Sequence, residues 1–140
     1  ICDMNTEFNK VNQIYQGTKG KYAYHQRIPL LEEGGHTLRF NGLVKYNNDS
    51  GQYDEWNYGE GVYGSETPFA PVKGANRGSA EDHGYIMSLV TDSNDWTSYT
   101  LIFDAKNITQ GPICKLKLPH RAPFAFHTNW LKGEDIYINT

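Results

Sequence analysis

The sequence has few of the features that mark zinc-binding, membrane-spanning or nucleic-acid-binding proteins. It has only two cysteines, Cys2 and Cys114, far apart in 140 residues, and zinc sites use about four closely spaced ligands. The simplest expectation is two reduced thiols in a cytosolic protein. No apolar run reaches the length of about 20 residues that a transmembrane helix needs. The net charge of −3, with Lys and Arg scattered along the chain, argues against nucleic acid, whose phosphates require a basic surface.

The first residues also lack a targeting pattern. The sequence opens with Ile1 rather than Met, and no basic region is followed by an apolar stretch. We therefore expect no signal peptide, and we expect the sequence to start within a longer protein.

Helical periodicity is scarce as well. Apolar residues do not recur at three- and four-residue steps over any long window, as a helix requires. Short runs rich in β-branched and aromatic residues occur instead, separated by polar turns such as the hairpin signal at residues 47–51. This spacing predicts a single all-β unit: a sandwich, a barrel or a propeller. The expected strands cover residues 22–26, 42–46, 52–57, 68–72, 85–91, 99–104, 113–118 and 124–130, and residues 73–83 form a loop.

Five histidines are candidates for chemistry, but none forms a local metal-binding pair. They are His25, His36, His83, His120 and His127. The last one differs in its setting, because large aromatic residues surround it in the chain. A buried imidazole needs a partner, and both a metal ion and a backbone carbonyl would serve.

Acidic residues give a second set of candidates. Glu66 lies between Gly64-Ser65 and a Thr-Pro-Phe segment, where it is either an exposed acid in a turn or a carboxylate that accepts the outer N–H of a metal-bound histidine. The acids at positions 32–33 and 81–82 are expected to be solvated loop charges.

Several segments, in the same order along the chain, resemble the carotenoid cleavage oxygenases. Residues 80–88 are similar to a Glu-Asp-Asp-Gly-Tyr signature, with His83 in place of an Asp. Residues 64–69 resemble a Gly-Glu-Pro-x-Phe segment, in which Thr67 is either an additional residue or a replacement for the Pro, with Pro68 then unrelated to it. Residues 118–127 resemble the Leu-Pro-x-Arg-Val-Pro-x-Gly-Phe-His terminus, with Ala125 in place of Gly. Residues 103–106 and residues 4–24 add a Phe-Asp-Ala-Lys match and a Glu-Phe…Tyr-x-Tyr match.

This resemblance implies a fold and a metal site. The fold would be a seven-bladed β-propeller, with residues 1–140 as the C-terminal part of one propeller domain that contains its last blades. Four histidines hold one Fe(II) in the family, and the last of them corresponds to His127. Glu66 corresponds to a glutamate that orients a ligand. The other three ligands would lie upstream of this chain. Walls of the substrate tunnel are expected at Phe124, Phe126 and Phe69, for which core packing is the alternative.

The implied activity is that of a non-haem Fe(II) dioxygenase. It would cleave a conjugated C=C bond of a carotenoid or apocarotenoid with O2 to give two carbonyl products. Alternatives are a stilbene-cleaving dioxygenase of the same fold, or a retinoid isomerohydrolase. A metal-free β-propeller binding module is a further alternative. The location would be cytoplasmic or plastid-like, and any peripheral contact with a membrane would use parts outside this chain. The isolated chain is expected to be inactive.

Overall fold

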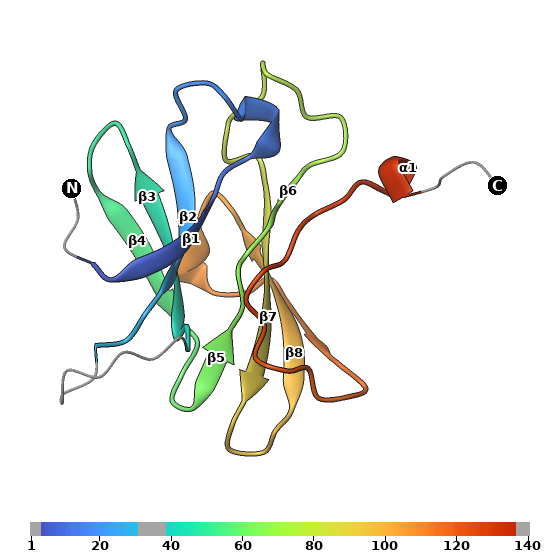
Figure 1. Cartoon of the computed structure of the whole chain (residues 1–140). Helices are drawn as coiled ribbons and strands as arrows, with labels where there is room; N and C mark the ends of the chain where they lie inside the picture. Colours follow the sequence, from blue (N-terminus) through green and yellow to red (C-terminus); the bar gives the residue numbers. More distant parts are fainter. Residues whose placement is uncertain (1–3, 31–38, 137–140) are drawn as a thin grey trace.

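Two antiparallel sheets lie side by side and make up most of the molecule (Figure 1). The computed structural model describes residues 4–30 and 39–136. The first sheet has the order β1-β2-β3-β4, so each strand pairs with its neighbour in sequence. Its strands are β1 (Thr6–Lys10), β2 (Tyr22–Arg27), β3 (Gly42–Asn47) and β4 (Tyr53–Asn57).

The second sheet has the order β5-β7-β8-β9, and β6 also pairs with β7. Its strands are β5 (Val62–Gly64), β6 (Phe69–Pro71), β7 (Gly84–Asp92), β8 (Ser98–Asp104) and β9 (Cys114–Lys117). Helical structure in the described residues is limited to η1 (Gln13–Tyr15), η2 (Ile108–Gln110) and α1 (Gly133–Ile136). None of the helices in these parts of the chain is long and apolar enough to cross a membrane.

One edge of the second sheet is built from an interrupted strand. β5 pairs with the end of β7 and β6 pairs with its beginning, so the two short strands lie along the same edge. Between them, the N–H of Ser65 donates to the Leu89 carbonyl and the N–H of Met87 donates to the Pro68 carbonyl. Residues 65–68 therefore stay anchored to β7, while Glu66 and Thr67 leave the regular ladder. We call residues 65–68 the strand break.

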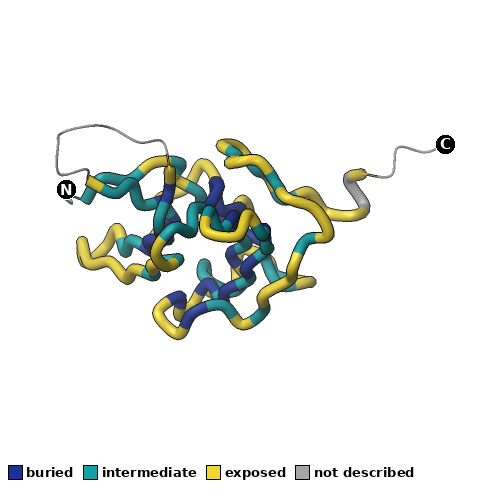
Figure 2. Tube along the Cα trace, turned by 90° about the horizontal axis from the view of Figure 1, so that it is seen from below, coloured by how far each residue is buried: buried dark blue, intermediate teal, exposed yellow. Residues whose placement is uncertain are grey.

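The hydrophobic core lies between the two sheets. Alternate residues of β7 and β8 are buried, as in strands with one face toward a core. Figure 2 shows these buried positions as dark blue segments inside an exposed outer surface. The first sheet contributes Tyr24 and Leu43 to the core cluster, and the second contributes Phe69, Ile86, Val90, Leu101 and Phe103.

Polar contacts join the sheets beside this core. Lys45 Nζ lies 2.9 Å from Asp82 Oδ2, and both side chains are largely buried. The Glu81 carboxylate accepts the backbone N–H groups of Lys21 and Tyr22 at 2.9 Å. The expectation of solvated loop charge is therefore wrong for positions 81–82, because these acids meet partners from the first sheet. Positions 32–33 lie outside the described residues.

The predicted all-β class is confirmed, and most expected strands are present with ends that differ by at most one residue. The sequence prediction missed β1 and β5, which are short and lack an apolar run. The strand expected at residues 124–130 is wrong: this segment joins neither sheet. It runs past the strand break, where the Glu66 N–H donates to the Phe126 carbonyl.

Candidate functional site

The C-terminal segment crosses the strand break and brings His127 to Glu66. Hydrogen bonds from the residues on both sides of His127 hold the segment against Glu66: the Glu66 N–H donates to the Phe126 carbonyl at 3.0 Å, and the Thr128 hydroxyl donates to the Glu66 carbonyl at 2.6 Å. Because Phe126 and Thr128 are both bonded to Glu66, the backbone of His127 between them is held beside the strand break. Glu66 and His127, which lie in separate segments of the sequence, thus meet in space.

The Glu66 carboxylate is buried and has a different partner on each side. Its side chain is 7% exposed. Oε1 lies 3.0 Å from Lys10 Nζ, and Oε2 accepts the Thr128 N–H at 2.8 Å. His127 Nδ1 lies 3.7 Å from the same Oε2. The alternative of an exposed acid in a turn is therefore wrong, because the Glu66 side chain is buried. Its partners offset the cost of removing the carboxylate from water.

The His127 imidazole presents its other nitrogen away from Glu66. Its side chain is 77% exposed, and its ring meets the Phe8 ring edge-on at 4.9 Å between centroids. Nδ1 faces the carboxylate, at a distance somewhat beyond a hydrogen bond. Nε2 is on the opposite side of the ring and remains available as a metal ligand, the arrangement that a carboxylate partner produces in metal-bound histidines.

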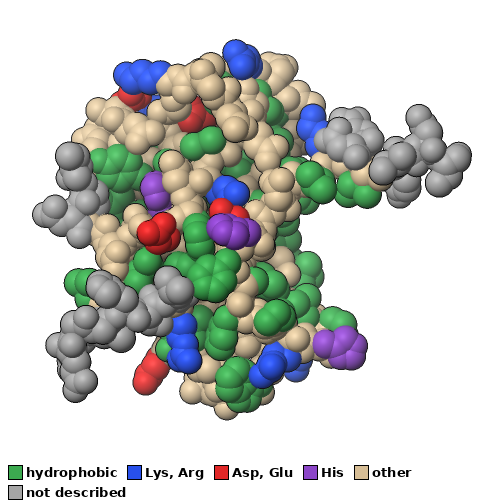
Figure 3. Space-filling model, viewed as in Figure 1, with side chains coloured by type: hydrophobic (Ala, Val, Ile, Leu, Met, Phe, Trp, Pro, Cys, Tyr) green, Lys and Arg blue, Asp and Glu red, His purple; other side chains and the backbone are tan. Residues whose placement is uncertain are grey.

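The residues around His127 suit one ligand of a metal centre and not a complete one. Across the described parts of the chain, no three histidine, cysteine or acidic side chains come close enough to hold a metal ion together. A cavity of about 580 Å³ adjoins the site, and Lys10, Glu66, His127 and Thr128 lie in its wall. Figure 3 shows histidine, acidic and basic side chains together near the middle of this face, with hydrophobic side chains around them.

The three predicted tunnel residues lie in different surroundings. Phe126 is partly exposed and packs against Phe8 and Phe40 beside His127. Phe124 lies farther along, against Tyr63 and Trp96. Phe69 is fully buried in the core against Tyr24, although it also contributes to the cavity wall.

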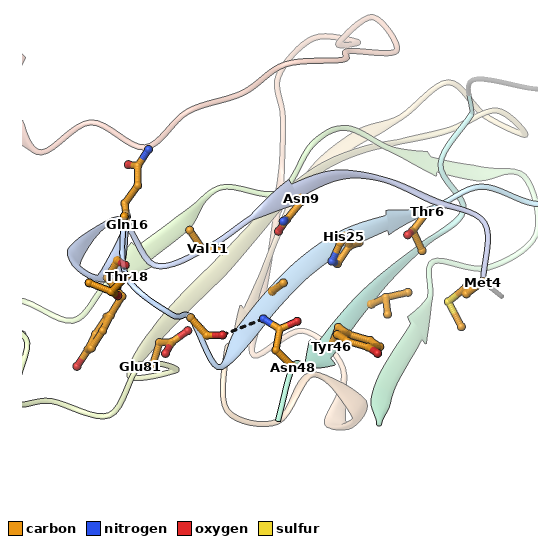
Figure 4. A pocket seen from close by; sticks show the side chains of 15 residues that line it. Met4, Thr6, Asn9, Val11, Gln16, Thr18, His25, Tyr46, Asn48 and Glu81 are labelled. Atoms are coloured by element: carbon orange, nitrogen blue, oxygen red, sulfur yellow. Dashed lines mark hydrogen bonds between the residues drawn. The ribbon is translucent and has the colours of Figure 1, made fainter. Parts of the chain in front are cut away.

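Among the described residues, no other histidine or cysteine lines the cavity beside His127. His120 is exposed, and Cys114 is a free, partly buried cysteine in β9. Cys2 and His36 lie outside the described residues. His25 points from β2 into a different cavity of about 390 Å³, which the first sheet forms with residues 15–18 and with Met4, Asn48 and Glu81 (Figure 4).

Sequence reasoning missed two side chains of the site, Lys10 and Phe8. Both belong to β1, whose pairing with β2 is irregular between Glu7 and Lys10. Phe8 has a φ of 57°, a conformation that is uncommon for a bulky residue. Such bulges redirect side chains, and this one directs the Phe8 ring toward His127. The sequence contains no local signal for this, because β1 lacks an apolar run.

Comparison with known proteins gives the same family that the motifs suggested. The model of the family described as retinal pigment epithelial membrane protein, RPE65, matches residues 1–132. A carotenoid 9,10(9',10')-cleavage dioxygenase 1 of Arabidopsis thaliana is 30% identical, with 96% of this chain and 26% of the relative covered. The Pisum sativum protein of the same name is 32% identical, with 93% and 25% covered. The chain thus spans about a quarter of the length of the curated relatives it matches.

Solved structures give the fold. The apocarotenoid oxygenase of Synechocystis superposes with a TM-score of 0.78 at 25% identity, with 91% of this chain and 25% of that one covered. The lignostilbene dioxygenase of Pseudomonas brassicacearum gives 0.80 at 24% identity, with 94% and 28% covered. The two sheets are blades of a β-propeller, as predicted. The chain belongs to the RPE65, or carotenoid cleavage oxygenase, family.

Proposed function

We propose that this chain is the C-terminal part of a single propeller domain in a non-haem Fe(II) dioxygenase. The whole protein would split a conjugated C=C bond of a carotenoid or apocarotenoid, with one atom of O2 entering each carbonyl product. The names of the Arabidopsis and Pisum relatives, which are carotenoid cleavage dioxygenases, support this reaction class. A stilbene substrate is the alternative within the same fold.

The observation that carries the proposal is the pairing of His127 with the buried Glu66. Glu66 Oε2 faces Nδ1 of the imidazole at 3.7 Å. A carboxylate in this position favours a proton on Nδ1 and leaves the Nε2 lone pair for a metal. A propeller that only binds partners has no need of this arrangement.

His127 would supply one of the imidazole ligands, and the others would come from parts of the protein outside this chain. Neutral imidazoles suit iron and leave its positive charge uncompensated. When bound, the iron supplies the activation of O2. In the whole protein, the Glu66 carboxylate would orient the imidazole by accepting its outer N–H. Phe8 and Phe126 pack around it, and we propose that Phe126, with Phe124 and Phe69, lines the path of an apolar polyene.

The location that fits this function is intracellular, in the cytoplasm or a plastid. Two Arabidopsis relatives are named as chloroplastic: a probable carotenoid cleavage dioxygenase 4 and a 9-cis-epoxycarotenoid dioxygenase. Any contact with a membrane that delivers the lipophilic substrate would use surfaces outside this chain.

The test compares the full-length protein with its His127→Ala variant for iron content and for O2-dependent loss of carotenoid. The control is His120→Ala, because His120 is an exposed loop residue only seven positions away. We expect about one iron in the wild type and in the control, and loss of both iron and activity in His127→Ala. A His127→Ala protein that keeps iron and activity would make His127 a packing residue and refute the assignment.

A further inference from the structure

The geometry points to Lys10 as the residue that positions Glu66 for its contact with His127. We infer that the Lys10 ammonium compensates the charge of the buried carboxylate and holds one oxygen, so that the other stays directed at the imidazole. This inference rests on the proposed function, because it concerns the histidine proposed to bind iron.

The burial of Glu66 makes a counter-charge necessary. Its side chain is 7% exposed, and an ionised carboxylate removed from water is costly unless it is paired. Lys10 provides the pairing at 3.0 Å, with a side chain that is itself 29% exposed. The ammonium therefore keeps some contact with solvent while its partner does not, which lowers the cost of forming the pair.

The two carboxylate oxygens have separate partners. Lys10 takes Oε1, and the Thr128 N–H takes Oε2 at 2.8 Å. With both oxygens held, rotation of the carboxylate is restricted, and Oε2 stays within 3.7 Å of His127 Nδ1. Without the ammonium, Oε1 would lose its charged partner, and the carboxylate would be free to hydrate or turn toward the cavity.

The placement of Lys10 depends on the first sheet and that of Glu66 on the second. Lys10 ends β1, directly after the irregular pairing around Phe8, and Glu66 lies in the strand break. The ion pair therefore connects the two sheets at the point where the C-terminal segment crosses. Because Lys10 and Glu66 are far apart in the sequence, their pairing depends on the tertiary fold.

A direct role of Lys10 toward a ligand is the rival explanation, since its side chain also lines the cavity beside His127. The two roles differ in how Lys10 depends on Glu66. A positioning residue has no further effect once Glu66 has been changed, whereas a residue that acts directly still has one. A double-mutant comparison separates them.

The experiment measures the rate at which a chelator removes Fe(II) from the full-length protein. The variants are Lys10→Met, Lys10→Gln, Lys10→Arg, Glu66→Gln, His127→Ala and the double variant Lys10→Met/Glu66→Gln. Lys19→Met is the matched control, because Lys19 also forms an ion pair, with Asp49 at 3.5 Å, but both side chains of that pair are exposed. Changes to groups that orient a metal ligand typically weaken metal affinity by about 10- to 100-fold.

We expect Lys10→Met and Lys10→Gln to lose iron about tenfold faster than the wild type. Lys10→Arg should restore retention, because it keeps the charge. The double variant should behave as Glu66→Gln alone. Lys10→Gln is included because a polar, partly exposed side chain tests the same loss of charge if the apolar variant fails to fold.

Each failure has a distinct meaning. If Glu66→Gln speeds iron loss and neither neutral Lys10 variant does, the positioning role is wrong and the proposed function stands. If the double variant loses iron faster than Glu66→Gln, Lys10 acts directly and the positioning role is again wrong. If neither Glu66→Gln nor His127→Ala changes iron retention, the proposed metal site itself is wrong.

Discussion

Gln26 of β2 donates a hydrogen bond from Nε2 to Thr67 Oγ1 at 3.0 Å, so the first sheet reaches the strand break directly. Both residues are completely buried. Gln26 Oε1 accepts the Tyr58 hydroxyl at 3.1 Å, and that hydroxyl accepts from Ser88 at 2.9 Å. Burial raises the pKa of Tyr58 to about 12, so the hydroxyl keeps its proton and can donate. Glu66 thus directly precedes Thr67, the residue that joins the strand break to the first sheet.

We expect Gln26→Leu to destabilise the protein by about 1–3 kcal/mol. The substitution keeps the size of the side chain but leaves the hydroxyls of Thr67 and Tyr58 with one partner fewer inside the core. Urea unfolding of the protein with and without the substitution measures the change. Gln16→Leu, at an exposed position, is the control. An unchanged free energy of unfolding in Gln26→Leu would show that the network is not stabilising.

The contributions of Lys45 and Asp82 to the free energy of unfolding should depend strongly on each other. Lys45 Nζ also donates to the Lys106 carbonyl at 3.0 Å and lies over the Tyr22 ring. Removing one partner leaves the other charge largely buried and unpaired. We therefore expect Lys45→Met or Asp82→Leu to lower the free energy of unfolding by about 3–5 kcal/mol.

The double variant Lys45→Met/Asp82→Leu should be more stable than the sum of the single changes implies, because no unpaired charge remains. Denaturant titrations of the four proteins give the coupling free energy. Additive single effects would mean that the two side chains stabilise the fold independently.

Gly84 explains part of the signature at residues 80–88 in physical terms. A Cβ at this position would lie 2.5 Å from two ring atoms of Phe69 and 2.6 Å from the Ala70 carbonyl oxygen. We expect Gly84→Ala to destabilise by about 1–3 kcal/mol, because the core and β6 would have to move. Ala80→Gly, at an exposed position, serves as the reference for a change of one methyl group. Thermal unfolding measures both, and equal melting temperatures for Gly84→Ala and wild type would contradict the steric argument.

His25 should give the stability a dependence on pH. Burial lowers the pKa of His25 below its ordinary value of 6.5. Above pH 6.5 the ring is neutral in both the folded and the unfolded chain, so its contribution to stability is fully present. As pH falls below 6.5, the unfolded chain takes up the proton first, and the free energy of unfolding decreases until the folded pKa has been passed.

His25→Gln should therefore reduce the loss of stability between pH 6.5 and more acid values. Chemical unfolding at a series of pH values measures it, with His120→Gln as the control at an exposed position. An identical pH dependence for His25→Gln and wild type would rule out His25 as the source.

The sequence could predict most of the strands, though not β1 or β5, and it contains Glu66 and His127 of the candidate site in recognisable segments. The reasons are local. Alternating burial in β7 and β8 follows from a two-residue period, and Glu66 and His127 each lie within a motif. The roles of Lys10 and Phe8 could not be found in the same way, although Phe8 lies in the Glu-Phe match. Their roles depend on an irregular strand and on contacts with residues far along the chain, and neither leaves a periodic signal. The same applies to Glu81 and Asp82, whose partners lie in the first sheet.

The isolated chain, residues 1–140, should hold no stoichiometric iron and show no carotenoid turnover. In the described residues His127 has no companion ligands, and its side chain is 77% exposed, so water competes for the metal. A single imidazole does not provide the several ligands that a non-haem iron site uses. Anaerobic loading with Fe(II), desalting and iron analysis of the tag-free chain test this, with the His127→Ala chain beside it. About one iron per wild-type chain, lost in the variant, would mean that this chain carries a complete site, and the proposal that the other ligands lie elsewhere would be wrong.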